Sequence, residues 1–315
     1  RKTFNLNMNP IRVLFYGTSS FAVPILSALI NDDRFSVVGV VTQPDRPIGR
    51  HAELQAPPVK QKAVEFGLPV LQFEKIKSEE AFTSLHAFEA DVAVVASFGQ
   101  IIPQRVLDLT KFGMVNVHGS LLPQYRGASP IAAAIKNGDS ETGVTIMKMD
   151  ALMDHGPLLA FAAEPIRPDD STPDLERRLA MLGAKILPDV LFNYVNGTIQ
   201  PQEQDHTKAT AVKLLSRDDG KLDWTCGAGE LERTVRAYTP WPGTFTVING
   251  QRLKINRASV GETFHQPIGT HVIDTGEPAI VCGDHRALRF IEVQPEGKQK
   301  MNGKAYLTGH PNWNK

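Results

Sequence analysis

Two polar side chains in the stretch VNVHGSLLPQYRGASP, residues 115–130, have types and a spacing that could do chemistry. Asn116 and His118 are two residues apart in a segment typical of a buried strand ending at Gly119. Side chains at i and i+2 lie on one face of a strand, so the amide and the imidazole project together. Asn is a neutral hydrogen-bond donor, and His donates or accepts near physiological pH. The pair could stabilise an oxyanion or exchange a proton with an amine, although an isolated Asn-x-His is more often a polar strand end serving its loop.

A carboxylate is the third candidate group. Asp154 lies in the stretch MDALMDHGPLL, residues 149–159, in a Gly-containing loop after a predicted strand. A carboxylate in a cleft can raise the basicity of a nearby His or hold a water molecule. Taken alone, Asp-His-Gly is usually a turn, and Asp150 is an equal candidate.

The elements that must position these groups alternate between strand and helix. Short apolar runs predict buried strands at 11–17, 35–43, 91–99, 114–120 and 143–150. A segment with helical spacing begins near Phe21, and Ser19 or Ser20 is predicted to cap it. Such alternation predicts an α/β fold with a mostly parallel sheet, whose ligands bind at the carboxyl ends of the strands.

The second half of the chain has a different texture. Residues 171–197 predict a long helix with Thr172 as N-cap and with Pro188 kinking or splitting it. Its predicted apolar stripe is Leu175, Leu179, Leu182 and Ile186. A polar stretch then breaks the rhythm, and short β-rich pieces with a hairpin signal at Asn249-Gly250 predict a small OB-like barrel. The predicted boundaries are a leader at 1–10, an α/β domain at 11–198, a linker at 199–218 and a β-domain at 219–315.

Composition excludes several classes of protein. The 34 Lys and Arg balance 34 Asp and Glu, which argues against a globally basic nucleic-acid binder. Cys226 and Cys282 show no metal-ligand spacing, so we expect no structural metal and a reducing, cytoplasmic location. The lone glycine of Gly17-Thr18-Ser19-Ser20 does not make a dinucleotide fingerprint. No apolar run approaches the roughly 20 residues of a membrane span, and we expect a monomer without a membrane partner.

Read together, the stretches form an ordered set. SLLPQYRGASP follows the Asn116-x-His118 pair, and ETGVTIMKMD precedes Asp154 in LMDHG. This set resembles the 10-formyltetrahydrofolate-dependent formyltransferase family. Further motifs are similar to those of the members that act on methionyl-initiator tRNA, and they extend the resemblance over about residues 11–300: TQPDRPIGR (42–50), FGQIIP (98–103), LSRDDGKLDW (215–224) and PWPGT (240–244).

The resemblance implies a fold and a reaction. The fold is a Rossmann-like, mostly parallel formyltransferase domain followed by an OB-like module that helps to hold tRNA. The reaction is transfer of the formyl group of 10-formyltetrahydrofolate to the α-amino group of methionyl-initiator tRNA. It proceeds by direct attack of the amine through a tetrahedral intermediate, with no metal.

The resemblance also assigns site residues. Asn116, His118 and Asp154 match the catalytic trio of the family. The tetrahydrofolate-binding segment is matched by Ser120, Leu121, Leu122 and Pro123. The FGQIIP loop and residues 150–156 are expected to wall the pterin pocket. Arg50 is the expected contact residue of an inserted loop that grips the tRNA acceptor end.

One departure from the family pattern affects the tRNA contact. The family's loop commonly continues after Gly-Arg with glycine and lysines, whereas His51-Ala52-Glu53 follows here. Phosphate contacts supply much of the affinity for nucleic acids, so we expect a weaker or different grip. Arg252, Lys254 and Arg257 form either a local basic patch or a solvated strand edge.

Other functions remain open from the sequence. The same trio and folate segment occur in formyltransferases that act on an amino sugar nucleotide and in formyl-folate hydrolases. A catalytically idle RNA-binding protein is a third reading, although such a protein has no need of the three polar groups.

Overall fold

A computed structural model of the chain describes residues 9–48 and 53–314, and these form two compact units. Among the described residues, one unit comprises 9–48, 53–127, 143–164 and 176–211, and the other comprises 128–142, 165–175 and 212–314. Neither unit is continuous in sequence, whereas the predicted domain boundaries cut the chain into successive pieces. Residues 199–211, inside the predicted linker, belong to the first unit.

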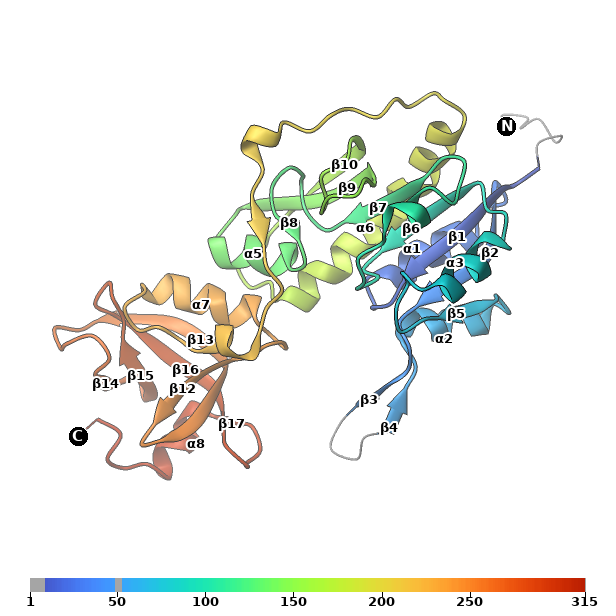
Figure 1. The fold of residues 1–315 in the computed structure, drawn as a ribbon. Coiled ribbons are helices and arrows are strands. Elements are labelled where there is room, and N and C mark those ends of the chain that lie inside the picture. The colour runs from blue at the N-terminus through green and yellow to red at the C-terminus, as the bar shows by residue number, and fades with distance from the viewer. Residues whose placement is uncertain (1–8, 49–52, 315) are drawn as a thin grey trace. The chain divides into compact units, whose positions relative to one another are not determined.

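The first unit is built on a seven-stranded sheet in the order β10-β9-β7-β6-β1-β2-β5 (Figure 1). Strand β1 pairs in parallel with β2 and β6, and β6 pairs in parallel with β7. Strand β9 runs antiparallel to β7. Since the other pairs named here are parallel, the prediction of a mostly parallel sheet is confirmed. The strand bounds are β1 Ile11–Gly17, β2 Phe35–Thr42, β5 Val70–Gln72, β6 Val92–Ala96, β7 Met114–His118, β9 Glu141–Lys148 and β10 Leu158–Pro165.

Helices cover both faces of this sheet. One core cluster contains Leu14 and Tyr16 of β1, Met114 of β7 and side chains of α3 (Glu79–His86) and α4 (Gln104–Leu107). The other face lies under α1 (Ala22–Ile30) and α6 (Thr172–Val195), and α2 (Pro58–Glu65) contacts α1. Strand residues therefore alternate between the two helical layers.

Helix α6 approaches the sheet closely through a glycine. A Cβ atom at Gly183 would lie 2.9 Å from Cγ1 of Val117 and 3.6 Å from Cδ1 of Ile25. The buried stripe runs through Leu175, Leu179, Gly183 and Leu187. The prediction of Leu182 and Ile186 for the second half of the stripe was wrong, since both are only partly buried. Periodicity of apolar side chains does not single out a glycine as the residue that packs against a strand.

The predicted helix caps were also wrong. Helix α1 follows Phe21 without a side-chain cap, and the hydroxyls of Ser19 and Ser20 bond instead to Ser97 and Glu176. Thr172 is the first residue of α6, and its hydroxyl donates to the carbonyl of Ala237 at 2.6 Å. The helix continues unbroken through Pro188, so the proline does not split it.

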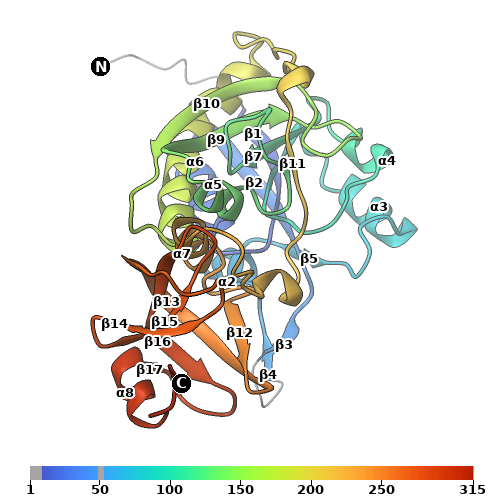
Figure 2. The same ribbon diagram turned by 90° about the vertical axis from the view of Figure 1, so that its left-hand side faces the viewer.

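The second unit contains an antiparallel sheet in the region where the sequence predicted a small OB-like barrel. Its sheet has the order β12-β13-β16-β15-β14, and β17 pairs with β16 (Figure 2). Asn249 and Gly250 both have positive φ in the β12–β13 hairpin, as the sequence predicted. Helices α7 (Ala228–Ala237) and α8 (Gly303–Thr308) pack on the sheet. The strands are β12 Thr244–Ile248, β13 Gln251–Thr263, β14 His271–Asp274, β15 Glu277–Val281, β16 Arg286–Pro295 and β17 Met301–Asn302.

The remaining elements are short. Strands β3 (Arg46–Ile48) and β4 (Glu53–Gln55) pair with each other, and β8 (Arg126–Gly127) pairs with β11 (Ala211–Val212). Helix α5 spans Pro130–Asn137, and two 3-10 turns span His206–Lys208 and Arg217–Gly220. Within the described part of the chain, every helix is too short or too polar to cross a membrane.

Candidate active site

Strand β7 presents Asn116 and His118 on the sheet face opposite α6. Val117 points toward Gly183 of α6, so the residues on either side of it project the other way. Asn116 is half-buried and His118 is buried. The predicted shared face of these two side chains is therefore confirmed, and the strand, with its ladder bonds to β6 and β9, fixes their spacing.

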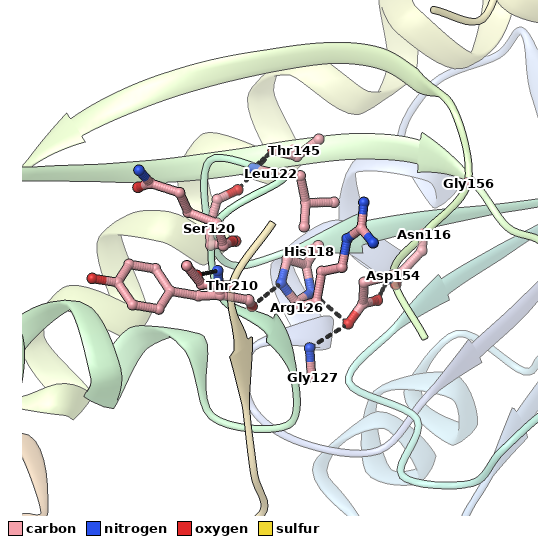
Figure 3. Close-up of polar contacts among 12 residues, drawn as sticks. Asn116, His118, Ser120, Leu122, Arg126, Gly127, Thr145, Asp154, Gly156 and Thr210 are labelled. Carbon is pink, nitrogen blue, oxygen red and sulfur yellow. Dashed lines mark hydrogen bonds and ion pairs between the residues drawn. The ribbon is translucent and has the colours of Figure 1, made fainter. Parts of the chain in front are cut away.

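Asp154 reaches the same place from the loop after β9. Its Oδ1 accepts a hydrogen bond from Nδ2 of Asn116 at 3.2 Å, and its Oδ2 lies 3.6 Å from Nδ1 of His118 (Figure 3). Oδ2 also accepts from the backbone N–H of Gly127 at 2.8 Å. The structure thus brings together the three groups that the sequence singled out.

The alternative carboxylate, Asp150, faces a different partner. Its Oδ2 lies 2.7 Å from Nδ1 of His155, and its Oδ1 accepts from the N–H of Leu152. Asp150 therefore braces its own loop, and Asp154 is the carboxylate that meets Asn116 and His118.

The second ring nitrogen of His118 is held by the backbone. Nε2 lies 3.0 Å from the carbonyl oxygen of Tyr125. A carbonyl oxygen can only accept, so Nε2 carries the hydrogen of this bond. Nδ1 is consequently the ring atom that faces Asp154, and any proton it takes up lies against an acceptor oxygen.

The loop of residues 120–127 is shaped by bonds from neighbouring segments. Thr145 of β9 donates its hydroxyl hydrogen to the carbonyl of Ser120 at 2.7 Å and accepts from the N–H of Leu122 at 3.0 Å. The Ser120 hydroxyl donates to the carbonyl of Gln124 at 2.6 Å. Ser120 and Leu122 are buried, so their backbone and packing rather than exposed side chains define this edge of the site.

Leu121 and Pro123 complete the predicted folate-binding segment. A Cβ at Gly143 would lie 2.5 Å from Cδ2 of Leu121, so Leu121 packs over the start of β9. The carbonyl of Pro123 accepts from the N–H of Thr210 at 3.3 Å. The four residues therefore form one continuous, tightly held turn beside His118.

The FGQIIP loop is anchored by its ends and leaves one apolar side chain in solvent. Phe98 and Ile102 are buried in the core cluster of the α3–α4 face, whereas Ile101 is 79% exposed. Gln100 donates to the carbonyl of Phe73 and accepts from the N–H of Ile76. An exposed apolar side chain on an anchored loop, such as Ile101, can pack against the flat ring of a ligand.

The inserted loop is anchored at its base, but Arg50 lies outside the described residues, as do His51 and Ala52. Lys60 donates to both carboxylate oxygens of Asp45, at 2.7 and 2.9 Å, and to Oε1 of Gln72. Arg46 forms a 2.6 Å ion pair with Glu74. These contacts hold the start of the loop beside β5.

Two further residues, Thr145 and Thr210, hold the backbone of the candidate site and were not singled out from the sequence. Thr145 is directly opposite His118 in the β7–β9 register, so a correct strand pairing would have placed it on the site's face. Thr210, whose hydroxyl accepts from the N–H of Tyr125 at 2.8 Å, comes from the polar stretch that was predicted to be a linker. Among the described residues, no group of three or more His, Cys, Asp and Glu side chains is arranged to hold a metal ion.

Comparisons with known proteins match the chain to one family over nearly its whole length. The chain matches the family model "Formyl transferase" over residues 10–191 and "Formyl transferase, C-terminal domain" over 214–311. It is 48% identical to a methionyl-tRNA formyltransferase of Roseiflexus sp. (strain RS-1), over 93% of this chain and 90% of that protein. It is 44% identical to the methionyl-tRNA formyltransferase of Chloroflexus aggregans, over 95% and 97% of the two chains.

A solved structure shows the same fold at low identity. The N-formyltransferase of Helicobacter canadensis, solved with folinic acid and dTDP-3-aminofucose, superimposes with a TM-score of 0.65 at 17% identity. The match covers 92% of this chain and all (100%) of that chain.

The Thr145 hydroxyl both donates and accepts a hydrogen bond, and we expect its loss to lower the stability of the fold. Thr145→Val keeps the shape of the side chain but leaves the carbonyl of Ser120 and the N–H of Leu122 without their partner. A buried polar group left unpaired costs about 1–3 kcal/mol, so the free energy of unfolding should fall by about that amount for each group that water cannot reach. Urea denaturation measures the loss, and Thr145→Ser is the control that retains the hydroxyl. Equal stability of Thr145→Val and the wild type would contradict the role of this hydroxyl.

Proposed function

The chain belongs to the formyl transferase family, among its methionyl-tRNA formyltransferases, and we propose that it formylates the α-amino group of methionyl-initiator tRNA with 10-formyltetrahydrofolate as donor. The main support for a catalytic role of Asn116, His118 and Asp154 is that the three side chains meet at one point. They come from two separate segments, and each has a fixed orientation. A protein that only binds RNA has no use for that arrangement.

The site residues fit a formyl donor. Nδ2 of Asn116 has two hydrogens, and the bond to Asp154 uses one of them. The other is available for the oxygen of the formyl group. The turn of residues 120–123 and the exposed Ile101 offer backbone and apolar surface for the folate ring system.

The chemistry follows from these positions. The amine nitrogen attacks the formyl carbon, the bond from that carbon to N10 breaks, and the amine proton ends on N10. Asn116 donates to the formyl oxygen as negative charge develops there, and His118 adds a compensating positive charge when its Nδ1 takes up a proton beside Asp154. Asp154, which lies against both of them, orients the pair and helps to pass the proton, directly or through a water molecule.

The acceptor is tested by offering formyl-folate with three candidates: charged initiator tRNA, uncharged initiator tRNA and an amino sugar nucleotide. We expect formylated product with methionyl-tRNA alone, measured by transfer of labelled formyl groups. Product with the sugar nucleotide would instead place the chain with the sugar formyltransferases. Release of formate without any acceptor would make it a hydrolase.

Substitution of each member of the trio tests the mechanism. Asn116→Ala should lower the rate of formyl transfer by about 100- to 1000-fold, the usual loss when one oxyanion donor is removed. His118→Ala and Asp154→Ala remove groups that balance charge and help to move the proton, so each should lower the rate by about 100- to 10,000-fold. Binding of the folate should remain largely intact, because the 120–123 turn is untouched. Single-turnover rates and a folate titration measure the two effects, and full activity of His118→Ala would refute its role.

Arg50 is proposed to contact the acceptor end of the tRNA. The support is the sequence motif together with the anchored base of its loop at Asp45 and Arg46. Arg50→Ala should raise KM for methionyl-tRNA more than KM for the folate, and the effect should shrink as salt screens phosphate contacts. An unchanged KM over a range of salt would remove this loop from the tRNA site.

A further inference from the structure

Gln204 is a buried polar residue that none of the sequence motifs includes. It lies in the polar stretch between α6 and β11, yet it is only 5% exposed. Its side-chain Nε2 donates to the carbonyl of Asp154 at 2.9 Å and to the carbonyl of Gly156 at 2.7 Å. Both hydrogens of the amide are therefore donated to the loop that contains Asp154.

The other end of the amide meets the loop of residues 120–127. Oε1 of Gln204 accepts from Nη2 of Arg126 at 2.7 Å and from Nε at 3.3 Å. Arginine only donates and a carbonyl only accepts, so these partners fix the orientation of the amide. Nη2 of Arg126 also lies 2.8 Å from Nδ1 of His206, two residues further along the same stretch.

The loop that Gln204 holds has few apolar contacts of its own, and the ring of His155 stacks on that of His206 with the centroids 4.2 Å apart. Asp154 has φ of +47°, a left-handed conformation that a non-glycine residue rarely adopts. Its neighbours Leu152 and Met153 are 62% and 59% exposed, so they add little burial. Gly156 closes the loop against β9, where a Cβ would lie 2.1 Å from the carbonyl of Lys148.

Bonds on either side of Asp154 therefore help to set where its carboxylate points, together with the bond from Asn116 to Oδ1. The Gln204 amide holds the backbone carbonyl, and the N–H of Gly127 holds Oδ2. Gly127 follows Arg126, which Gln204 also contacts. One side chain thus ties together the two loops whose relative position sets the distances from Asp154 to Asn116 and His118.

We propose that Gln204 is a positioning residue for formyl transfer, which sets the Asp154 carboxylate against Asn116 and His118 by joining the Asp154 loop to Arg126. This proposal rests on the proposed function for the reaction that it assists. It assigns Gln204 no contact with either substrate, so its effect is on the rate of the chemical step.

Gln204→Glu is the informative variant, because it keeps the size and the bonds to Arg126 but turns an oxygen toward the two carbonyl groups. Gln204→Ala removes both halves. Misplacement of a catalytic group by about 1 Å can cost about 100-fold, and loss of a supporting contact typically costs about 10- to 100-fold. We expect kcat to fall by about 10- to 100-fold in both variants, with KM for the folate and for methionyl-tRNA close to wild type.

The matched control is Gln202→Glu. It makes the same chemical change two residues away, where the side chain is exposed and donates to the carbonyl of Gln200 at 3.3 Å. This variant should keep wild-type kcat. The melting temperature of each variant shows whether a lower rate comes from a smaller folded fraction.

A double-mutant cycle separates positioning from a purely structural role. If Gln204 acts through Asp154, then Gln204→Ala should cause little further loss in an Asp154→Asn background, since coupled residues are not additive. Full, additive losses would overturn the proposal, and so would wild-type kcat in both Gln204 variants.

Hydrogen–deuterium exchange gives a readout that does not depend on the reaction. Exchange of the amides at 150–156 should be faster in Gln204→Ala and Gln204→Glu than in the wild type and in Gln202→Glu. Unchanged exchange would contradict the proposal that Gln204 holds the Asp154 loop, even if the wild type proved to formylate another acceptor. Faster exchange, together with a wild type that does not formylate methionyl-tRNA, would support the role of Gln204 in holding the loop and overturn the proposed function.

Discussion

The Asp154 carboxylate is the point on which the site is built. It accepts from the Asn116 side chain and the Gly127 backbone, and it faces the ring of His118. A largely buried carboxylate must have such partners, because an unpaired charge away from water is costly. Meeting that requirement draws strand β7, the loop after it and the loop after β9 into one place. The catalytic geometry that we propose is therefore the same set of contacts that satisfies the buried charge.

The sheet supplies rigidity where the chemistry needs it, and the loops supply the remaining groups. Asn116 and His118 are on a strand locked between β6 and β9, with α6 packed on its reverse face at Gly183. Asp154, by contrast, lies on a loop with left-handed backbone. The Gln204 side chain, from another segment, compensates for that weaker support, and Thr145 holds the turn of residues 120–122 in the same way. Because the loops lack the support of the sheet, buried hydrogen bonds hold them in place instead. This is why such bonds are concentrated around the short turn of residues 120–123.

Much of this could be predicted from the sequence, for physical reasons that also explain the errors. Apolar runs and their spacing predicted the strands, and the i, i+2 rule placed Asn116 and His118 on one face. Local patterns do not reveal which distant groups satisfy a buried polar atom. The serine caps were wrong because Ser19 and Ser20 found tertiary partners, and the role of Gln204 was hidden in a stretch whose polarity is typical of a linker. Asp154 and Asp150 could be told apart only by their partners.

A crystal structure of the enzyme with a stable N10-formyl analogue of folate would test the proposed geometry most directly. We expect the formyl oxygen to lie within hydrogen-bond distance of Nδ2 of Asn116, with the His118 ring beside it and N10 on the side of Asp154. An analogue bound with its formyl group out of reach of all three side chains would show that these residues do not act on the formyl group.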